Sequence, residues 1–436
     1  MELLAPAGNF EKLKFALAYG ADAVYAGLPQ FSLRARENSF TSIEDIAQAI
    51  NYTHQKKSRF FLASNIIPHN NKIPSFEKAL AEFIDLGPDA LIMSDPGMIH
   101  YVRKNFPEQE IHLSVQANCT NWSTAKFWYE MGVKRIILSR ELNLREIEEI
   151  HKMCPQVELE VFVHGAICMA HSGRCLLSNY MNNRASNQGA CSNACRFEFQ
   201  LYALNKPQSN DYIPLEGEFY LKENKNPDDE LMLIDEDQFG TYIMNSKDMC
   251  AIEHLDKLKS AGIVSVKIEG RTKSLYYLAQ SVRSYRGALD DLDRGLPWNR
   301  KHLANVQKLD SRGTIPGFFI PLRDMPQNYT SSRVPSESAY IAGIVRSYND
   351  ETKRVHVSVK GAIHEGDVLE LATPTGEKII TVQNLKDHKS NPTEKVSSGL
   401  ENATFDLDEN PGEYAMLIGI LNKKNKMDLA TLSTES

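Results

Sequence analysis

The sequence lacks every long apolar run that a membrane-spanning helix would need, since no stretch reaches about 18 consecutive apolar residues. The first residues, Met1 to Pro6, contain neither the basic nor the apolar region of a secretory signal, so we expect a cytoplasmic protein with no membrane partner. Also missing are the H-E-x-x-H, G-x-S-x-G and Walker A patterns, and no G-x-G-x-x-G follows the first predicted strand. These absences argue against common metalloprotease, serine hydrolase, P-loop ATPase and dinucleotide-binding mechanisms.

Positive charge is also scarce, because the 436 residues carry a net charge of −7. This balance argues against a protein that coats nucleic acid by bulk attraction, although it leaves room for one local basic patch. The chain is 42% hydrophobic and 24% charged, which is typical of a globular protein with a proper core. Its length suits two domains.

Cysteine is present but concentrated. Of the seven cysteines, Cys119, Cys154 and Cys250 are isolated in sequence, and we predict a structural role for them as small apolar residues. The other four fall within 28 residues, in a stretch rich in Gly, Ser and Asn that directly follows a strand-like run. They have the spacing C-x(6)-C-x(15)-C-x(3)-C and are Cys168, Cys175, Cys191 and Cys195.

Four interpretations of this cluster remain open from spacing alone. Zinc ribbons draw their ligands from two tight pairs, and a separation of six residues is loose for such a pair. Iron-sulfur clusters are also held by four thiolates, at more variable spacing, and this is the leading hypothesis. Disulfides need an oxidising compartment, and cysteines without any shared role are the fourth interpretation.

Short β-rich runs alternate with amphipathic helical stretches from the first residue, which is typical of repeated βα units around a parallel sheet. Eight strands are predicted, at residues 3–7, 23–27, 60–66, 90–95, 111–118, 135–140, 159–165 and 264–269. This pattern predicts an α/β fold, a (β/α)8 TIM-like barrel, over residues 1–320. An open doubly wound sheet is the alternative.

The segment between the seventh and eighth strands is too long for a βα connection and predicts a cysteine-cluster insertion over residues 166–260. Within it we expect an antiparallel pair, 197–204 with 240–245, and a helix over 246–260. Residues 321–335 are rich in Pro, Ser, Arg and Asn and indicate a linker. Four short strands beyond it predict a small C-terminal β-barrel domain over residues 336–436.

In a (β/α)8 barrel the active site lies at the carboxyl ends of the strands, so polar residues there are candidates for binding and chemistry. From them we take Asn65, Gln116, Asn118, Arg140 and Arg271 as substrate-binding candidates and His164, Lys267 and Glu269 as catalytic candidates.

Among the catalytic candidates, Lys267 and Glu269 alternate with apolar residues and therefore share one side of a strand, where burial is costly unless they pair or bind a ligand. His164 precedes Cys168 by four residues. It can act as an acid or base, ligate the metal centre, or simply pack in the core. A nucleophilic Cys168 or Cys175 activated by His164 is a further alternative.

Several long motifs make the sequence resemble peptidase family U-32, the collagenase-like family. They lie at 4–8 (LAPAG), 20–27 (GADAVYAG), 87–97 (GPDALIMSDPG), 112–118 (HLSVQAN), 163–166 (VHGA), 172–175 (SGRC) and 267–274 (KIEGRTKS). Three others are similar to the branch of the family that is named for tRNA hydroxylation. These lie at 121–122 (NW), 139–142 (SREL) and 242–248 (YIMNSKD).

The resemblance implies a protein needed to convert the wobble uridine of certain tRNAs to 5-hydroxyuridine, by an oxygen-independent route that depends on prephenate and an iron-sulfur cluster. The four cluster cysteines of the family fall on the four named above, and a 4Fe-4S cluster is then expected in place of zinc. Arg140, Lys267 and Arg271 would bind a dicarboxylate such as prephenate. The expected partners are the tRNA anticodon loop and, as a further possibility, a protein that donates electrons.

Two other functions remain open at this stage. The older name of the family implies a peptidase. A non-catalytic tRNA-binding or assembly protein with a structural metal centre is the second alternative.

Overall fold

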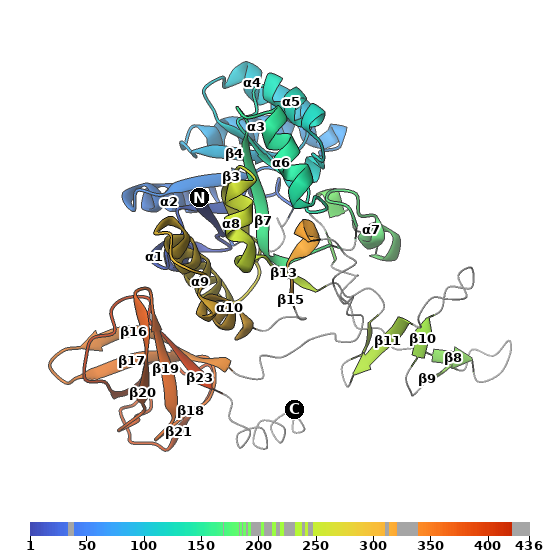
Figure 1. Cartoon of the computed structure of the whole chain (residues 1–436). Helices are drawn as coiled ribbons and strands as arrows, with labels where there is room; N and C mark the ends of the chain where they lie inside the picture. The colour runs from blue at the N-terminus through green and yellow to red at the C-terminus, as the bar shows by residue number, and fades with distance from the viewer. Residues whose placement is uncertain are drawn as a thin grey trace.

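The structure is a computed structural model that describes residues 1–33, 39–168, 170–182, 184, 186–188, 191–192, 247–309, 314–320 and 339–420, together with short strands between 202 and 242. Figure 1 shows a helix-rich domain joined to a smaller domain built of strands. None of the helices in these ranges is both long enough and apolar enough to span a membrane.

Eight parallel strands close into the predicted barrel, in the order β14-β1-β2-β3-β4-β5-β6-β7, and β14 pairs with β7 to complete the ring. The strands are β1 (Glu2–Pro6), β2 (Ala23–Gly27), β3 (Arg59–Ala63), β4 (Ala90–Met93), β5 (Ile111–Leu113), β6 (Arg135–Ile137), β7 (Glu158–Ala166) and β14 (Ile263–Ile268). The (β/α)8 fold is therefore confirmed, and the open-sheet alternative is wrong. Several strands end earlier than predicted, because polar loops take over at the barrel mouth.

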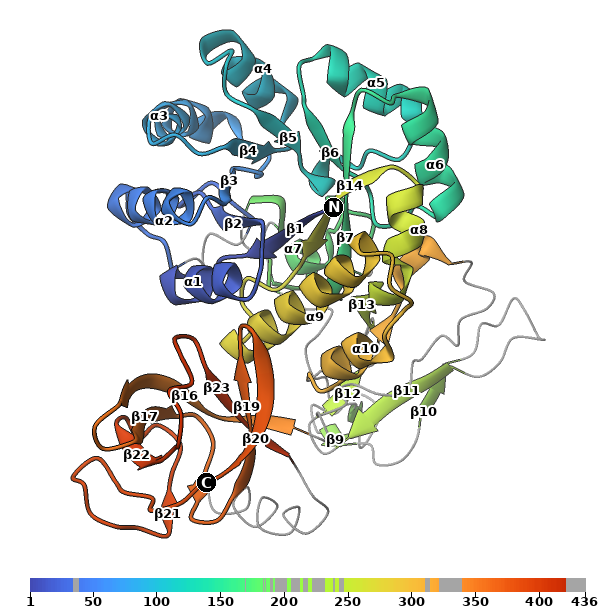
Figure 2. The ribbon, with the colours of Figure 1, turned by 60° about the vertical axis from the view of Figure 1, so that its left-hand side comes forward.

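Helices surround the barrel, as Figure 2 shows. They are α1 (Phe10–Ala18), α2 (Ile43–Gln55), α3 (Ile73–Ile84), α4 (Pro96–Asn105), α5 (Trp122–Glu130), α6 (Leu144–Met153), α8 (Leu255–Ser260) and α9 (Leu275–Asp293), with α10 (Arg300–Gln307) packed on α9. Local sequence sets where they begin. Asn9 caps α1 by accepting from the Lys12 amide, and Ser42 and Asp45 form a reciprocal capping box on α2.

The insertion after β7 differs from its predicted internal structure. Strand β8 (Tyr202–Leu204) pairs with β9 (Tyr212–Pro214), while β12 (Gly240–Tyr242) pairs with β11 (Met232–Asp237), and β11 also pairs with β10 (Phe219–Leu221). Each strand thus pairs with a sequence neighbour, so the predicted pairing of 197–204 with 240–245 is wrong. A helix over 246–260 is also wrong in its first half. There β13 (Asp248–Cys250) adds to the outside of β7 in antiparallel orientation and pairs with β15 (Thr314–Ile315).

The C-terminal domain, predicted as a small β-barrel, is an antiparallel sheet domain with its own hydrophobic core. Its six-stranded sheet has the order β20-β19-β23-β16-β17-β22, and β18 pairs with β21. The strands are β16 (Ala339–Asn349), β17 (Arg354–Val359), β18 (Ile363–His364), β19 (Val368–Thr373), β20 (Gly376–Thr381), β21 (Lys395–Val396), β22 (Ala403–Asp406) and β23 (Met416–Ile420). The predicted linker, 321–335, lies outside the described residues.

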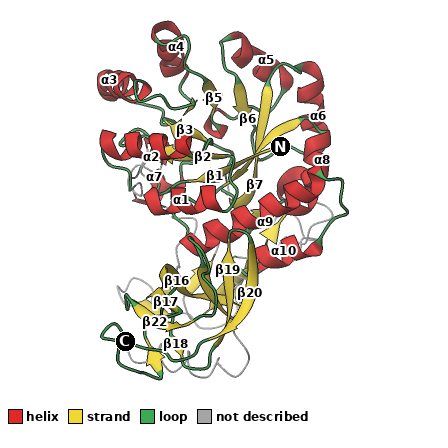
Figure 3. Cartoon of the chain, turned by 90° about the vertical axis from the view of Figure 1, so that its left-hand side faces the viewer, coloured by secondary structure: helices red, strands yellow, loops and turns green. Residues whose placement is uncertain are grey.

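This domain packs beside α1 and α9 of the barrel (Figure 3). The hydroxyl of Tyr19, which follows α1, donates toward the carbonyl oxygens of Tyr414, at 2.9 Å, and Ala372, at 3.2 Å. Lys308 forms an ion pair with Glu370 at 2.8 Å. Backbone acceptors and ion pairs therefore hold the two domains together on the side of the barrel.

Candidate functional site

A cavity of about 320 Å³ lies at the carboxyl ends of the barrel strands. Strands β2, β7 and β14 and the loops after β3, β5 and β6 supply its polar and aromatic lining, and the cysteine-bearing loop covers it. The polar side chains that line it include Asn65, Ser114, Gln116, Arg140, Lys267, Glu269 and Arg271. The cavity has the position that a barrel enzyme uses for its active site.

Lys267 lies at the floor of this cavity and is almost fully buried. Its Nζ is 3.2 Å from Oε1 of Glu160, a fully buried carboxylate, and 4.3 Å from the centre of the Tyr25 ring. The Tyr25 hydroxyl in turn lies 3.5 Å from Oε2 of Glu269. The cavity floor therefore carries the ammonium group of Lys267, whose charge is balanced by the Glu160 carboxylate beneath it.

Arg140 forms one wall. Its guanidinium carbon lies 4.0 Å from the centre of the Phe162 ring, and Nη1 donates to the Ala166 carbonyl at 2.8 Å. Its Nε is buried and has no hydrogen-bond partner among the residues that the structure describes. A held guanidinium with donor capacity to spare suits a carboxylate ligand.

Asn65 and Ser114 form the opposite, neutral wall. The Asn65 amide donates to the Ser114 hydroxyl at 3.1 Å, and the Ser94 hydroxyl donates to the Asn65 carbonyl at 2.8 Å. Gln116 follows in a single turn after β5. This wall offers amide and hydroxyl groups, which recognise neutral polar groups of a ligand.

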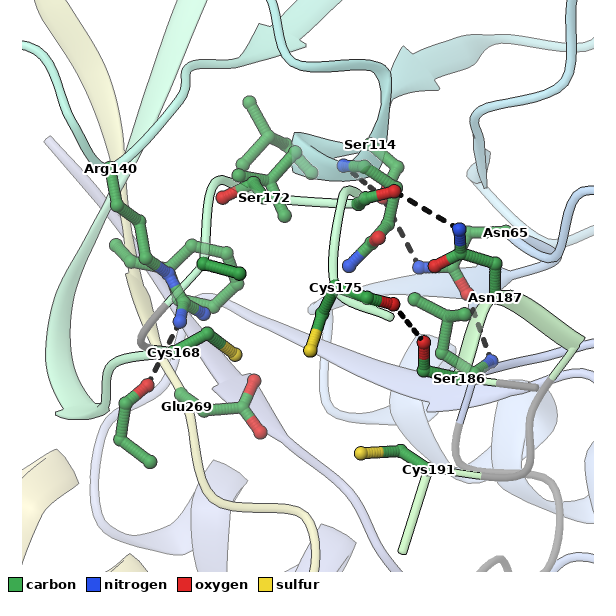
Figure 4. A pocket seen from close by; sticks show the side chains of 18 of the residues that line it. Asn65, Ser114, Arg140, Cys168, Ser172, Cys175, Ser186, Asn187, Cys191 and Glu269 are labelled. Carbon is green, nitrogen blue, oxygen red and sulfur yellow. Dashed lines mark hydrogen bonds between the residues drawn. The ribbon is translucent and has the colours of Figure 1, made fainter. Parts of the chain in front are cut away.

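Three of the four clustered cysteines line the same cavity: Cys168, Cys175 and Cys191. Figure 4 shows their sulfur atoms and the Glu269 carboxylate facing a common space. Cys168 is exposed and the other two are half-buried. Cys195 lies outside the described residues.

The loop that carries these thiols is anchored by polar contacts. The Ser186 hydroxyl donates to the Cys175 carbonyl at 2.7 Å, and the Asn187 amide donates to the Gly173 carbonyl at 3.1 Å. Gly173 has a φ of +74° and approaches so closely that a Cβ there would lie 2.3 Å from the Gln116 carbonyl oxygen. The loop therefore packs tightly onto the mouth of the barrel.

The thiols share the cavity without forming a closed ligand set. Within the described part of the chain, no three His, Cys, Asp or Glu side chains stand close enough together to hold a metal ion. The remaining cysteines, Cys119, Cys154 and Cys250, are buried, which agrees with the structural role predicted for them.

Most of the predicted binding and catalytic residues line the cavity, but two do not. Asn118 follows β5 in a left-handed conformation, with a φ of 54°, and its Oδ1 accepts from Ser139 at 2.7 Å. It supports a loop, because the predicted strand ends at Leu113 and a 3-10 turn redirects the chain.

His164 is buried on the outer side of the barrel wall, between Tyr277 and Tyr285 of α9, with ring centres 5.4 and 5.5 Å away. Burial lowers the pKa of its imidazole to about 4. Since the ring does not line the cavity, the predicted Cys–His nucleophile pair with Cys168 or Cys175 is not assembled.

Two acidic residues that were not among the predicted site residues also shape the site. Glu160 contacts Lys267 from below, and Glu141 accepts from the Ser172 amide at 3.0 Å, which holds the cysteine loop. Glu160 alternates with apolar residues in the predicted seventh strand, as Lys267 does in the eighth. The same argument from alternation could have found it.

Comparison with known proteins decides the family. Residues 8–328 match the profile of peptidase family U32, and residues 337–418 match that of the peptidase family U32 C-terminal domain. The chain belongs to peptidase family U32.

Relatives in this family carry names that refer to RNA. The chain is 44% identical to the tRNA hydroxylation protein P of Escherichia coli (strain K12), over 89% of both chains. It is 42% identical to the protein of the same name from Haemophilus influenzae, over 93% of this chain and 92% of that one. It is also 32% identical to the 23S rRNA 5-hydroxycytidine C2501 synthase of E. coli, over 74% of this chain and 43% of that protein.

Proposed function

We propose that this U32 protein takes part in tRNA modification as the hydroxylase, or an essential component of it, that converts the wobble uridine to 5-hydroxyuridine. The names of its relatives support a role in tRNA hydroxylation. The observation that carries the proposal is one cavity, at the active-site end of a barrel, that combines three thiols with Arg140 and Lys267. Metal-binding and anion-binding groups thus lie within reach of one ligand.

The proposed cofactor is a 4Fe-4S cluster held by Cys168, Cys175, Cys191 and Cys195. In support, the first three line the cavity and are accessible, whereas the isolated cysteines are buried. A bound cluster supplies one-electron redox chemistry at a potential set by its surroundings. An electron-donating partner protein belongs to the same proposal.

The proposed co-substrate or precursor is prephenate, a dicarboxylate. The cationic groups of Arg140, Lys267 and Arg271 all line the cavity, and guanidinium groups match the geometry of carboxylates. A volume of about 320 Å³ suits a small molecule of this class. The role of these residues is to bind and orient the dicarboxylate beside the thiols.

The target base is proposed to enter through the rim. Anticodon loops present unstacked bases, which proteins recognise by stacking and by contacts to base edges. Leu176 on the rim is 72% exposed, and Arg174 and Arg184, in the same cysteine-bearing segment, are exposed cations. These residues offer an apolar contact and local positive charge on a protein whose net charge is −7.

The test is to express wild-type protein, Cys175→Ala and Arg140→Ala in cells that lack the gene, and to measure 5-hydroxyuridine in digested tRNA by mass spectrometry. Wild type should restore the nucleoside, and both variants, present at wild-type level, should not. Unchanged 5-hydroxyuridine in both variants would overturn the proposal. Stoichiometric zinc without acid-labile sulfide in anaerobically purified protein would show a structural centre, and turnover of peptides by pure protein would favour the peptidase alternative.

A further inference from the structure

Glu160, the third residue of β7, is a carboxylate with no exposed surface inside the barrel. It has three partners: Arg135 Nη1 at 3.2 Å, the Ser265 hydroxyl at 3.1 Å and Lys267 Nζ at 3.2 Å. Barrel interiors are ordinarily filled by layers of branched apolar side chains. A charged residue here is costly unless its partners compensate for the lost hydration.

Arg135 holds the Glu160 carboxylate from the amino-terminal end of the barrel. Arg135 also pairs with Glu2 at 2.5 Å and Glu158 at 2.7 Å, both at the amino-terminal ends of their strands. Neither Arg135 nor Ser265 lines the cavity, whereas Lys267 does. The buried network therefore presents a single charged group, the Lys267 ammonium, to the cavity.

The surroundings of Lys267 include charges of both signs. Glu160 on β7 and Glu269, which follows β14, favour its protonated form, as does the face of the Tyr25 ring on β2. Arg271, beyond β14, opposes it, and the other groups around this network are Arg135 and Arg140 on β6 or just beyond it, His112 on β5 and Glu2 on β1. Burial lowers the pKa of Lys267, and the Glu160 carboxylate acts in the opposite direction.

Glu160 itself remains ionised in this setting. Burial alone would raise the pKa of its carboxyl, but Lys267 and Arg135 together hold that pKa below its usual value. The carboxylate is thus available to balance the ammonium group at its 3.2 Å separation.

We infer that Glu160 is a positioning residue, which holds Lys267 as an ammonium ion at the cavity floor by direct ion pairing from the barrel interior. The inference rests on the proposed function in one respect, namely that the ligand bound by the Lys267 ammonium is a dicarboxylate. Without Glu160 the pKa of Lys267 would fall further, because burial would then act with less opposition.

The charge state of Lys267 can be measured without tRNA, cofactor or prephenate. Only an unprotonated amine reacts with acetic anhydride, so trace acetylation of Lys267 in the full-length protein, quantified by peptide mass spectrometry between pH 6 and 11, reports its titration midpoint. The variants are Glu160→Gln, which keeps shape but removes charge, and Glu158→Gln as a control. Glu158 contacts the same Arg135 but not Lys267.

Glu160→Gln should lower the midpoint of Lys267 by about one pH unit or more, and Glu158→Gln should leave it near that of wild type. An unchanged midpoint in Glu160→Gln, or an equal fall in Glu158→Gln, would overturn the inference. If Glu160→Gln does not fold, Glu160→Asp is the second variant, because its side chain is one methylene shorter and its carboxylate lies further from Lys267. A fall in the Lys267 midpoint by less than about one pH unit would then support the inference, and an unchanged midpoint would overturn it. Loss of hydroxylation alone bears on the proposed function and not on this result.

Discussion

Arg140 stacks on Phe162 with 4.0 Å between the guanidinium carbon and the ring centre, so its position in the cavity is set before any ligand arrives. The Ala166 carbonyl accepts from Nη1 and leaves the buried Nε without a partner within the described residues. A ligand carboxylate can approach the rest of the guanidinium from the cavity without moving the side chain. A cation that is already oriented loses little side-chain entropy on binding.

We therefore expect Arg140→Lys to weaken prephenate binding, because lysine keeps the charge but cannot stack or donate from two nitrogens. The loss should be about 1.5 kcal/mol, or about tenfold in affinity, by isothermal titration calorimetry. Arg145→Lys, an exposed change on α6, is the matched control and should bind as wild type does. Equal affinity in the two variants would contradict a role for Arg140 in binding.

Replacement of Cys191 by alanine should remove both iron and acid-labile sulfide from anaerobically purified protein. The broad absorbance at about 400 nm should disappear with them. Cys154→Ser is the control, since a serine can preserve the 3.3 Å contact of Cys154 with the Trp122 carbonyl. The control should retain its iron. Full iron content in Cys191→Ala would exclude that cysteine from the ligand set.

His164 should make the protein sensitive to acid. The buried ring has a pKa of about 4, below the ordinary value, so its neutral form contributes stability that is fully present above about pH 6.5. That contribution is lost as the pH falls toward 4, and the loss has reached about 2 kcal/mol at pH 5.

His164→Phe, which keeps a ring between the two tyrosines, should therefore lose less stability than wild type between pH 7 and pH 5 in urea denaturation. The control is His100→Phe, at an exposed position on α4. It should keep the wild-type dependence on pH. The same dependence in His164→Phe would mean that this ring titrates normally.

Gly173→Ala should loosen the cysteine loop. Both Gly173 and Gly366 have positive φ, so alanine costs about 1–2 kcal/mol of backbone strain at either site. Only at Gly173 would the new Cβ also meet a backbone atom, the Gln116 carbonyl oxygen at 2.3 Å, whereas nothing lies within 4 Å at Gly366. Trypsin should cleave after Arg174 and Arg184 faster in Gly173→Ala than in Gly366→Ala, and equal rates would contradict the tight packing of the loop.

The barrel and most of its mouth could be predicted because parallel strands bury both faces and end in polar residues. Asn65 and Glu269 follow from that rule. His164 does not, because Lys267 pairs with Phe162 while the next residue, Ile268, pairs with His164. Val163 therefore has no residue opposite it in β14, and this irregularity in the register turns His164 to the outer face of the barrel.

Other features depend on tertiary contacts that alternation does not encode. The chain between residues 197 and 245 has several short β-rich runs of similar strength, and the pairing of neighbours was not distinguishable from a longer-range pairing. Alternation marks Glu160 as an unusual residue in its strand, but its ion pairs with Arg135 and Lys267 join three strands and could not be predicted.

The strand that closes the barrel, β14, is separated from its neighbour β7 by the segment that carries the cysteines. During synthesis the chain therefore produces seven barrel strands and all four candidate thiols before the eighth strand exists. Closing the ring over so long a loop has an entropic cost that short connections avoid, which makes it a late step in folding. Lys267 arrives with that strand, so Glu160, which already has Arg135 on β6 beside it, gains its second cationic partner at the moment of closure. Until then the growing barrel has an open side next to the thiols, through which the proposed metal centre could be delivered.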